Sequence, residues 1–386
     1  MKEGWNSGTF ADIFDLQMGK TPSRDNPSFW GGDNIWVSIA DMNCGKFIYD
    51  TKEHISDLAV SQSGIHLVKK NTVIMSFKLS IGKTAIATKD LYTNEAIMSF
   101  NIKDGFNILP TYIYYYLKGY KWQGMNKAVM GMTLNKKTIS NNIFSYPTIP
   151  LQQHIVEELD LLSSIIEKKK TQLNELDNLA QSLFYEMFGD LNFNTNKYLI
   201  KKLGEVCSIE RGGSPRPITD YITDAENGIN WIKIGDAVEG SKYIMTTAER
   251  IKPEGMKKSR FVHKGDFILS NSMSFGKPYI LGVDGCIHDG WLVIHDDNDV
   301  FDKSYLYYYL SSPTLYGEFK RLAVGGVVNN LNSKLVRGVK VAIPPLELQK
   351  LFAQKERAIE NQKELIKQSI KEVETLFNSR MDYYFN

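Results

Sequence analysis

Two clusters of imidazole and carboxylate side chains are the best candidates for a metal-dependent or hydrolytic site. They are His288-Asp289 and His295-Asp296-Asp297. Such ligands can hold a divalent ion and activate water. Residues 290–294 between them have the composition of a β-strand, which would separate the clusters by about 20 Å. The first half of the chain has only Asn94-Glu95 at the matching place. We therefore expect polar strand ends and no metal site.

Motifs for other chemistry are absent. Gly-Lys-Thr occurs at Gly19 and Gly82, but a phosphate-binding loop also needs a glycine five residues earlier, where the chain has Phe14 and Phe77. There is no Asn-Pro-Pro-aromatic segment of the kind that holds a flipped adenine, no glycine-rich dinucleotide fingerprint and no Gly-x-Ser-x-Gly elbow. The sequence predicts no catalytic residue and no cofactor.

The near balance of 46 basic and 44 acidic residues conceals local excesses of positive charge. No acidic residue lies between Asp57 and Asp90, between Asp104 and Glu157, or between Glu318 and Glu347, and each stretch contains five Lys or Arg residues. Cationic surfaces of this kind are typical of proteins that bind nucleic-acid phosphates. Chance clustering on solvated faces is the alternative.

Three kinds of segment, each present twice, could contact DNA through polar side chains on turns. The first is a proline turn whose arginine could pair with guanine or be a surface charge. The second is a Ser/Gly/Lys segment that suits a hairpin tip facing phosphates, although its glycines are also what a turn needs. The third is an Asn/Lys stretch in which asparagine could read adenine or serve as a turn residue. The candidates are Thr21, Ser23, Arg24, Ser214 and Arg216 in the first; Ser76, Lys78, Ser80, Lys83, Ser270, Ser272, Ser274 and Lys277 in the second; and Asn126, Lys127, Asn135, Lys136, Asn329, Asn330 and Lys334 in the third.

The chain contains an internal duplication with an offset of 193 to 197 residues. Segments that recur in the same order are Gly19-Lys-Thr-Pro-Ser with Gly212-Gly-Ser-Pro-Arg, Trp36-Val-Ser-Ile-Ala-Asp with Trp231-Ile-Lys-Ile-Gly-Asp, Ser76–Lys83 with Ser270–Lys277, and Tyr112–Leu117 with Tyr305–Leu310. The tyrosines at helical spacing in the last pair indicate core more than base stacking. One unit is used twice.

Each unit consists of a mixed α+β globule followed by a long helix. Short β-branched and aromatic runs bounded by turn residues predict strands at 36–40, 72–76, 266–270 and 290–295. We expect globules at 1–147 and 191–341, and helical segments at 148–190 and 342–386. Apolar steps of four and three, such as Leu159, Leu162 and Ile166, predict that the two helices pair as an antiparallel coiled coil in a pseudo-two-fold molecule.

The first helix carries its predicted seam on through Leu173, Leu176, Ala180, Leu183 and Met187. Pro150 and Pro345 stand where the helices can start, and Gly189 stands where the first should stop.

The ordered motifs resemble the specificity subunit of type I restriction-modification systems. The resemblance rests on the Gly-x-Thr/Ser-Pro turns, the Ser-x-x-x-Ser-x-Gly-Lys segments and Ile343-Pro-Pro-Leu-Glu-Leu-Gln. It covers nearly the whole chain, and the first copy departs from it at Ile149-Pro-Leu-Gln-Gln.

This family implies that each globule is a target-recognition domain that reads one half of a bipartite double-stranded DNA sequence. The paired helices would set the spacing of the half-sites and dock two modification (adenine methyltransferase) subunits, which in turn carry the restriction subunits. The chain itself would have no catalytic site, and the target sequence and spacer length cannot be derived from it.

Two other hypotheses remain at this stage. The chain could be a coiled-coil scaffold for proteins with only non-specific DNA affinity, or a nuclease with an unrecognised site. Three widely spaced cysteines, no apolar leader and no long apolar run argue against secretion, structural zinc and membrane insertion, and we expect a cytoplasmic protein.

Overall fold

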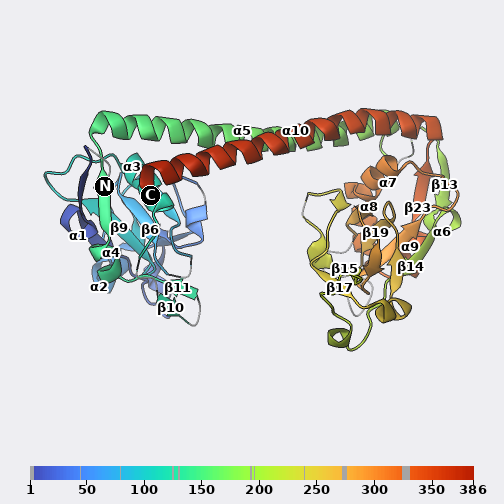
Figure 1. Ribbon diagram of the computed structural model, residues 1–386, viewed down its shortest axis with the longest axis horizontal. Coiled ribbons are helices and arrows are strands. Elements are labelled where there is room, and N and C mark those ends of the chain that lie inside the picture. Colours follow the sequence, from blue (N-terminus) through green and yellow to red (C-terminus); the bar gives the residue numbers. More distant parts are fainter. Residues whose placement is uncertain are drawn as a thin grey trace. The chain divides into compact units, whose positions relative to one another are not determined.

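The computed structural model describes residues 4–43, 45–78, 80–123, 126–128, 131–191, 194, 196–238, 240–271, 276–323 and 331–386, and only the backbone of residues 126–128, 131–133 and 323. The chain divides into two compact units. Unit 1 consists of Met1–Lys170 and Gln368–Asn386, and unit 2 consists of Thr171–Lys367. Each unit therefore contains one globule and one half of each of two 40-residue helices, α5 (Ile149–Phe188) and α10 (Leu346–Phe385) (Figure 1).

Unit 1 is built on a five-stranded sheet and a three-stranded sheet. The five strands lie in the order β2-β9-β6-β7-β4, with β4 parallel to β7 and the other pairs antiparallel. The elements are β1 (Asn6–Thr9), α1 (Phe10–Ile13), β2 (Phe14–Met18), β3 (Trp30–Val37), β4 (Phe47–Ile48), β5 (Glu53–Ile55), α2 (Asp57–Ser63), β6 (Val73–Ser76), β7 (Thr84–Ala87), β8 (Tyr92–Thr93), β9 (Ile97–Ile102), α3 (Pro110–Gly119), β10 (Asn126–Ala128), β11 (Gly131–Thr133), α4 (Lys136–Asn141) and β12 (Ile143–Tyr146).

Unit 2 repeats this plan with the five-stranded order β14-β22-β19-β20-β16, and β16 is again parallel to its neighbour. Its second sheet has four strands, β17-β15-β21-β18. The elements are β13 (Leu199–Lys202), α6 (Leu203–Val206), β14 (Ser208–Arg211), β15 (Ile229–Ile232), β16 (Tyr243–Ile244), β17 (Glu249–Ile251), β18 (Arg260–Val262), β19 (Phe267–Ser270), β20 (Pro278–Leu281), β21 (Gly285–Ile287), β22 (Trp291–His295), α7 (Lys303–Leu310), α8 (Pro313–Ala323), α9 (Ser333–Gly338) and β23 (Lys340–Ile343).

The expected strands agree with β6, β19 and β22 to within one residue. The strand expected at 36–40 instead ends at Val37, because the Asp41 carboxylate accepts hydrogen bonds from the backbone and hydroxyl of Ser38 and turns the chain. The tyrosines at 112–116 and Tyr305 and Tyr309 are buried, which confirms that they belong to the core. Tyr307 and Tyr308 are partly buried and pack against the core of unit 2.

Within each unit the two long helices run antiparallel. In unit 1, Glu158 binds Arg380 at 2.6 Å and Lys170 lies 4.0 Å from Glu374. In unit 2, Asp177 binds Lys363 at 2.6 Å, and the ring of Phe184 lies 5.5 Å from that of Phe352. Residues further along α5 therefore contact residues earlier in α10. The predicted antiparallel pairing is therefore present in each unit.

The predicted seam holds at one end of α5 and shifts at the other. Leu159, Leu162 and Ile166 are buried as expected, but near the end of the helix Phe184 and Phe188 are buried instead of Leu183 and Met187. Those two phenylalanines join the core of unit 2, so the last turns pack on a globule as well as on a helix.

Gly189 ends α5 with φ 73°, and its backbone N–H donates to Tyr185 at 2.8 Å. A glycine adopts this left-handed conformation without steric cost, which explains the predicted stop.

Each globule is pinned to the start of its long helix by a buried glutamine. Gln152 accepts a hydrogen bond from the backbone of Leu109 at 2.8 Å and donates to the carbonyl of Pro147 at 2.9 Å. Gln349 makes the equivalent bonds to Asp302 and Pro344 at the same distances. Both glutamines are fully buried, so the direction in which each helix leaves its globule is specified locally.

Candidate nucleic-acid interface

The proline turn of unit 1 is held by two carboxylates. The hydroxyl of Thr21 donates to Glu95, and Arg24 donates to both carboxylate oxygens of Glu53, at 2.5 and 2.9 Å. The Arg24 guanidinium also lies 3.7 Å from the centre of the Trp30 ring, and its hydrogen bonds lower the pKa of Glu53. Two of the five N–H donors of Arg24 are thus committed to Glu53, and the bidentate pair holds the guanidinium in place within the turn. Ser23 lies in the same turn, and its hydroxyl accepts from the backbone of Asp25 at 3.3 Å.

The matching turn of unit 2 holds its arginine more loosely. Ser214 donates to Asp289 at 2.6 Å, as Thr21 does to Glu95. The Arg216 guanidinium is 3.5 Å from the same carboxylate, and its side chain is 80% exposed. Arg216 is therefore better placed than Arg24 to meet a base edge.

The Ser/Gly/Lys segments form loops closed by a buried serine. The Ser76 hydroxyl donates to the carbonyl of Ser80 and accepts from the backbone N–H of Lys83, and the Ser270 hydroxyl accepts from that of Lys277 at 3.0 Å. Ser76 and Ser270 are buried, so their hydroxyls position the loop and do not face its surface, which corrects the expectation for these two.

Among the residues of these loops that the structure describes, three of the candidate lysines and one serine have side chains at the surface. Lys83 and Lys78 are partly exposed, and Lys277 and Ser80 are exposed. Ser272 and Ser274 lie outside the described residues.

The Asn/Lys stretches contain helix caps. The side-chain oxygen of Asn135 accepts from the backbone of Thr138 at 2.8 Å, and Asn332 does the same for Leu335 at 3.0 Å. Asn135 thus uses the oxygen that two-hydrogen-bond reading of adenine requires, and it acts first as an N-cap. Lys136 and Lys334 are exposed at the starts of these helices. Asn126 and Lys127 lie on β10 with only their backbone described, and Asn329 and Asn330 lie outside the described residues.

The three segments of unit 1 meet at one place. Glu95, which holds the proline turn, precedes Ala96, whose carbonyl accepts from the backbone N–H of Phe77 at 2.9 Å. The carbonyl of Phe77 in turn accepts from Leu134 at 3.0 Å. We call the segments 94–96 and 288–290 the junction loops.

Unit 2 repeats this arrangement. Asn271 donates to the carbonyl of Gly290 at 2.9 Å and accepts from Leu331 at 2.9 Å, while Ser214 binds Asp289. Segments chosen separately from the sequence thus converge in each globule around a junction loop.

The junction loops supply two residues that the sequence analysis did not select as contacts. Hydrogen bonds from Thr21 and Ser214 lower the pKa values of Glu95 and Asp289, so both carboxylates are ionised near neutral pH. The sequence signal for these carboxylates is the matching place of Asn94-Glu95 and His288-Asp289 in the two repeats.

Comparisons with known proteins show the family to which this duplicated arrangement belongs. The family model for the type I restriction modification DNA specificity domain matches residues 2–178 and again residues 196–375. The chain belongs to this family. Each match begins in one globule and extends into the long helix that follows it, so the family covers both repeats.

Individual relatives are more distant. The type I restriction enzyme MjaIX specificity subunit of Methanocaldococcus jannaschii is 27% identical over 257 residues, 61% of this chain and 59% of that protein. The EcoR124I/EcoR124II specificity subunit of Escherichia coli is 29% identical over 199 residues, 49% of this chain and 48% of that protein. The chain thus matches less than two thirds of the length of these relatives.

Two solved structures share the fold. A chain from a study of complex assembly and conformational transition of the type I R-M system aligns over 100% of this chain and 98% of its own length, with a TM-score of 0.64 and 17% identity. The S subunit of a type I restriction-modification system from M. genitalium aligns over 98% and 95%, with a TM-score of 0.52 and 14% identity.

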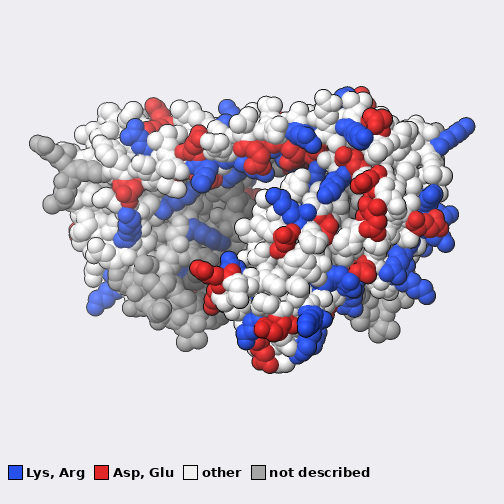
Figure 2. All heavy atoms as spheres, turned by 45° about the vertical axis from the view of Figure 1, so that its right-hand side comes forward, with Lys and Arg blue, Asp and Glu red and all other residues white. Residues whose placement is uncertain are grey.

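The cationic stretches found in the sequence are partly neutralised by acids from outside them. Lys69 binds Asp90 at 2.9 Å, and Lys121 binds Asp382 at 2.7 Å. On the face shown in Figure 2, blue and red side chains lie next to one another and form no continuous patch of one sign among the described residues. The sequence could not show this, because Asp382 lies 261 residues from Lys121.

The residues of the metal candidate have other partners. The His288 ring accepts a hydrogen bond from the backbone of Gly290 at 2.7 Å, and burial lowers its pKa. His295 lies at the far end of β22, 3.5 Å from Asp266. Among the described residues, no group of three or more His, Cys, Asp or Glu side chains could hold a metal ion. In the same part of the chain, no helix is long and apolar enough to span a lipid bilayer.

Proposed function

We propose that this chain is the DNA sequence-recognition subunit of a type I restriction-modification complex and has no catalytic site of its own. Each globule reads one half of a bipartite double-stranded target through the segments around its junction loop. The observation that carries this proposal is the duplicated convergence: two globules of one fold each bring a hydroxyl, a carboxylate and exposed lysines together. Duplicated readers on a continuous helix suit two short sites at a fixed separation.

We further propose that α5 and α10 set the spacing of the half-sites and dock two modification subunits, through which restriction subunits join in the cytoplasm. Both helices carry leucines exposed over about half of their surface or more: Leu161, Leu179, Leu365 and Leu376. These side chains are available for contact with a partner protein, and the assembly experiment below tests whether they are used.

The experiment that tests the function is selection from random duplex DNA by the chain purified with its methyltransferase subunit. Two short defined blocks separated by a constant run of unspecified bases are expected. Strong retention of DNA without any motif would support the scaffold hypothesis and overturn the recognition function.

Lys83→Ala should weaken binding to all DNA sequences about equally and lower the slope of log K against log salt by about one. The reason is that Lys83 lies at the end of the Ser76 loop and is proposed to contact a phosphate. Titration at several salt concentrations measures the slope. Lys367→Ala is the matched control, because that exposed lysine lies on α10 and binds Glu364. An unaltered slope would remove Lys83 from the contacts.

Asp289→Asn should reduce base discrimination in the second half-site and leave that in the first unchanged. Glu95→Gln should do the reverse. Each carboxylate holds a hydroxyl of its proline turn, and Asp289 also attracts Arg216. Discrimination against single mismatches, normally about 1–3 kcal/mol per base pair, should fall in one half-site while non-specific binding rises with the loss of a negative charge. Competition assays with mismatched duplexes measure this. Equal effects of one variant on both half-sites would contradict it.

Leu365→Lys should weaken association with the methyltransferase subunit, because the side chain is 69% exposed on α10 and its replacement places a charge in an apolar contact. Lys371→Ala on the same helix is the control. Analytical ultracentrifugation of the mixed subunits measures assembly. Unchanged assembly would exclude this leucine from the docking surface.

A further inference from the structure

Each globule is joined to the long helices at a second point by a lysine. Lys46 and Lys242 immediately precede the edge strands β4 and β16, and their carbonyls accept from Ile86 at 2.9 Å and Ile280 at 3.0 Å within the five-stranded sheets. Their backbones are thus part of the recognition globules, and their ammonium groups reach the long helices.

In unit 2 this contact is a closed, buried triangle. The Nζ of Lys242 is 2.9 Å from Oε1 of Glu356 on α10 and 3.0 Å from the hydroxyl of Ser304, which donates to the other oxygen of Glu356 at 3.0 Å. The Lys242 and Glu356 side chains are 7% and 4% exposed. The lysine also lies 5.3 Å from the ring of Tyr307. We call this set the second clamp.

In unit 1 an equivalent pair is less buried. The Nζ of Lys46 is 2.6 Å from Oδ1 of Asp160 on α5, which also accepts from the hydroxyl of Tyr115. The lysine is 4.8 Å from the Tyr115 ring. The Lys46 side chain is 16% exposed, but that of Asp160 is 45% exposed. We call this set the first clamp.

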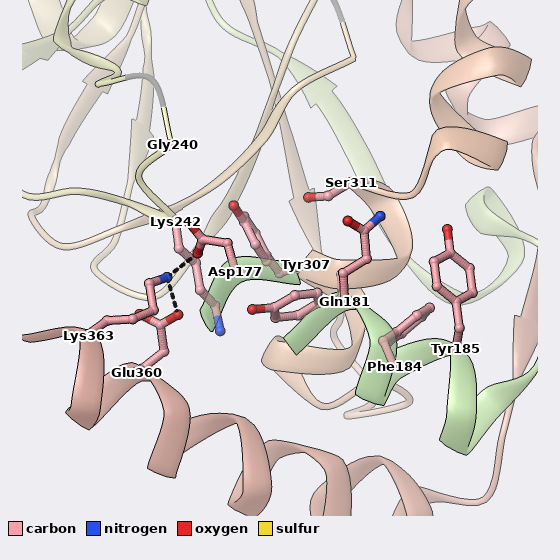
Figure 3. Close-up of a pocket in the computed structure, with 11 residues that line it drawn as sticks. Asp177, Gln181, Phe184, Tyr185, Gly240, Lys242, Tyr307, Ser311, Glu360 and Lys363 are labelled. Atoms are coloured by element: carbon pink, nitrogen blue, oxygen red, sulfur yellow. Dashed lines mark hydrogen bonds and ion pairs between the residues drawn. The ribbon is translucent and has the colours of Figure 1, made fainter. Parts of the chain in front are cut away.

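A cavity adjoins each clamp, so neither is part of a continuous apolar core. The cavity in unit 2, of about 210 Å³, is lined by Lys242, by residues of α5 and by Glu360 and Lys363 of α10. In Figure 3 the ammonium group of Lys363 bridges Asp177 and Glu360, which ties α5 to α10 beside the clamp. The cavity in unit 1, of about 490 Å³, is lined by both Lys46 and Asp160. Directed ionic contacts therefore hold the globules where packing is incomplete.

The clamps hold each globule at a place on the helix separate from that of the buried glutamine. The buried glutamines hold the start of each helix, and the clamps act eight residues further along α5 (Gln152 to Asp160) and seven along α10 (Gln349 to Glu356). That spacing is about 10–12 Å of helix. Apolar side chains of the helices, such as Leu159 and Phe352, also pack in the globule cores. The clamps add a charged contact from the edge strands, so their loss should loosen the angle of each globule, and rotation of a globule displaces the base pairs that it meets.

We propose that Lys46–Asp160 and Lys242–Glu356 are positioning pairs that fix the angle of each recognition globule on the long helices, and so determine how strictly one spacer length is selected. The proposal rests on the proposed DNA-recognition function. The clamps do not touch DNA, so the base preferences within each half-site are independent of them.

The test uses the full chain with its methyltransferase subunit and the variant Lys242→Met/Glu356→Gln, which removes both charges together. The substrates are duplexes that keep the selected half-sites and vary the spacer by one base pair in each direction. The preference for the correct spacer over its neighbours should fall by about tenfold, within the range for coupled contacting residues. The half-site sequences recovered by selection should not change.

Three further variants make the result decisive. Lys350→Met/Glu347→Gln removes an exposed pair from the same helix, with side chains 57% and 86% exposed, and should leave spacer preference unchanged. The charge-swapped Lys242→Glu/Glu356→Lys should recover part of it. If the unit 2 variants do not fold, Lys46→Met/Asp160→Asn in the half-exposed first clamp decides the question.

An unchanged spacer preference in a folded clamp variant would overturn the inference, and so would loss of base preference within a half-site. Failure of the proposed function has a different result, because the unaltered chain would then select no split motif at all.

Discussion

Exchange of residues 1–147 for the corresponding globule of another member of the family should replace one half-site and leave the other unchanged. The reason is that the contacts around the first junction loop are internal to this globule: Thr21 with Glu95, Phe77 with Ala96, and Leu134 with Phe77. Each altered base pair should change affinity by about 1–3 kcal/mol, so a half-site of several base pairs changes by orders of magnitude. Selection from random duplex DNA measures the outcome.

The design of the exchange follows from the clamps. The incoming globule must supply a lysine in place of Lys46, because Asp160 stays in the recipient chain. Exchange of residues 191–341 is the reciprocal control and should alter only the other half-site. If either exchange altered both halves, recognition would not be modular, whereas a change of spacer alone would point to the seating of the globule.

Lys242→Met alone should destabilise unit 2 by about 3–5 kcal/mol, because it leaves the carboxylate of Glu356 buried without its counter-ion. Hydrogen exchange is a suitable measurement, since it reports the opening of unit 2 separately from that of unit 1. Protection of amides in β19 and β20 should fall, while that of β6 and β7 should not.

A double-mutant cycle distinguishes the contribution of the ion pair from the cost of leaving one buried charge without a partner. Lys242→Met/Glu356→Leu should be less destabilised than Lys242→Met, since no buried charge remains. The exposed control Lys350→Met should cost less than about 1 kcal/mol. Equal destabilisation by Lys242→Met and Lys350→Met would show that the clamp does not contribute.

Much of the architecture could be predicted because its signals are local in sequence. Helical spacing identified the buried tyrosines of α3 and α7, and Gly189 marked the end of α5. For the tyrosine helices, the duplication provided the same pattern twice. The predicted apolar positions of α5 differ from the buried ones only where α5 meets the core of unit 2. A heptad pattern describes helix–helix contacts, and it does not predict that Phe184 and Phe188 pack on a globule.

The candidate interface was less predictable, because its decisive contacts join residues far apart in the chain. Residue type left Arg24 as either a guanine contact or a surface charge, and its partner Glu53 lies 29 residues away. Ser76 and Ser270 recur because they close a loop from inside, and recurrence in a sequence does not distinguish such a role from a surface contact. The sequence identifies the candidate segments. The structure is needed to tell which of their side-chain atoms are free to contact DNA.

The last turns of α10 belong to unit 1. Met381, Tyr384 and Phe385 are buried in the hydrophobic core of unit 1, together with Phe10. They pack so closely on α3 that a Cβ on Gly119 would come within 2.9 Å of Met381. During synthesis the ribosome makes these residues after the whole of unit 2. The core of unit 1 therefore cannot be completed until unit 2 has been synthesised. A chain truncated after Arg380 should therefore be damaged in unit 1 before unit 2.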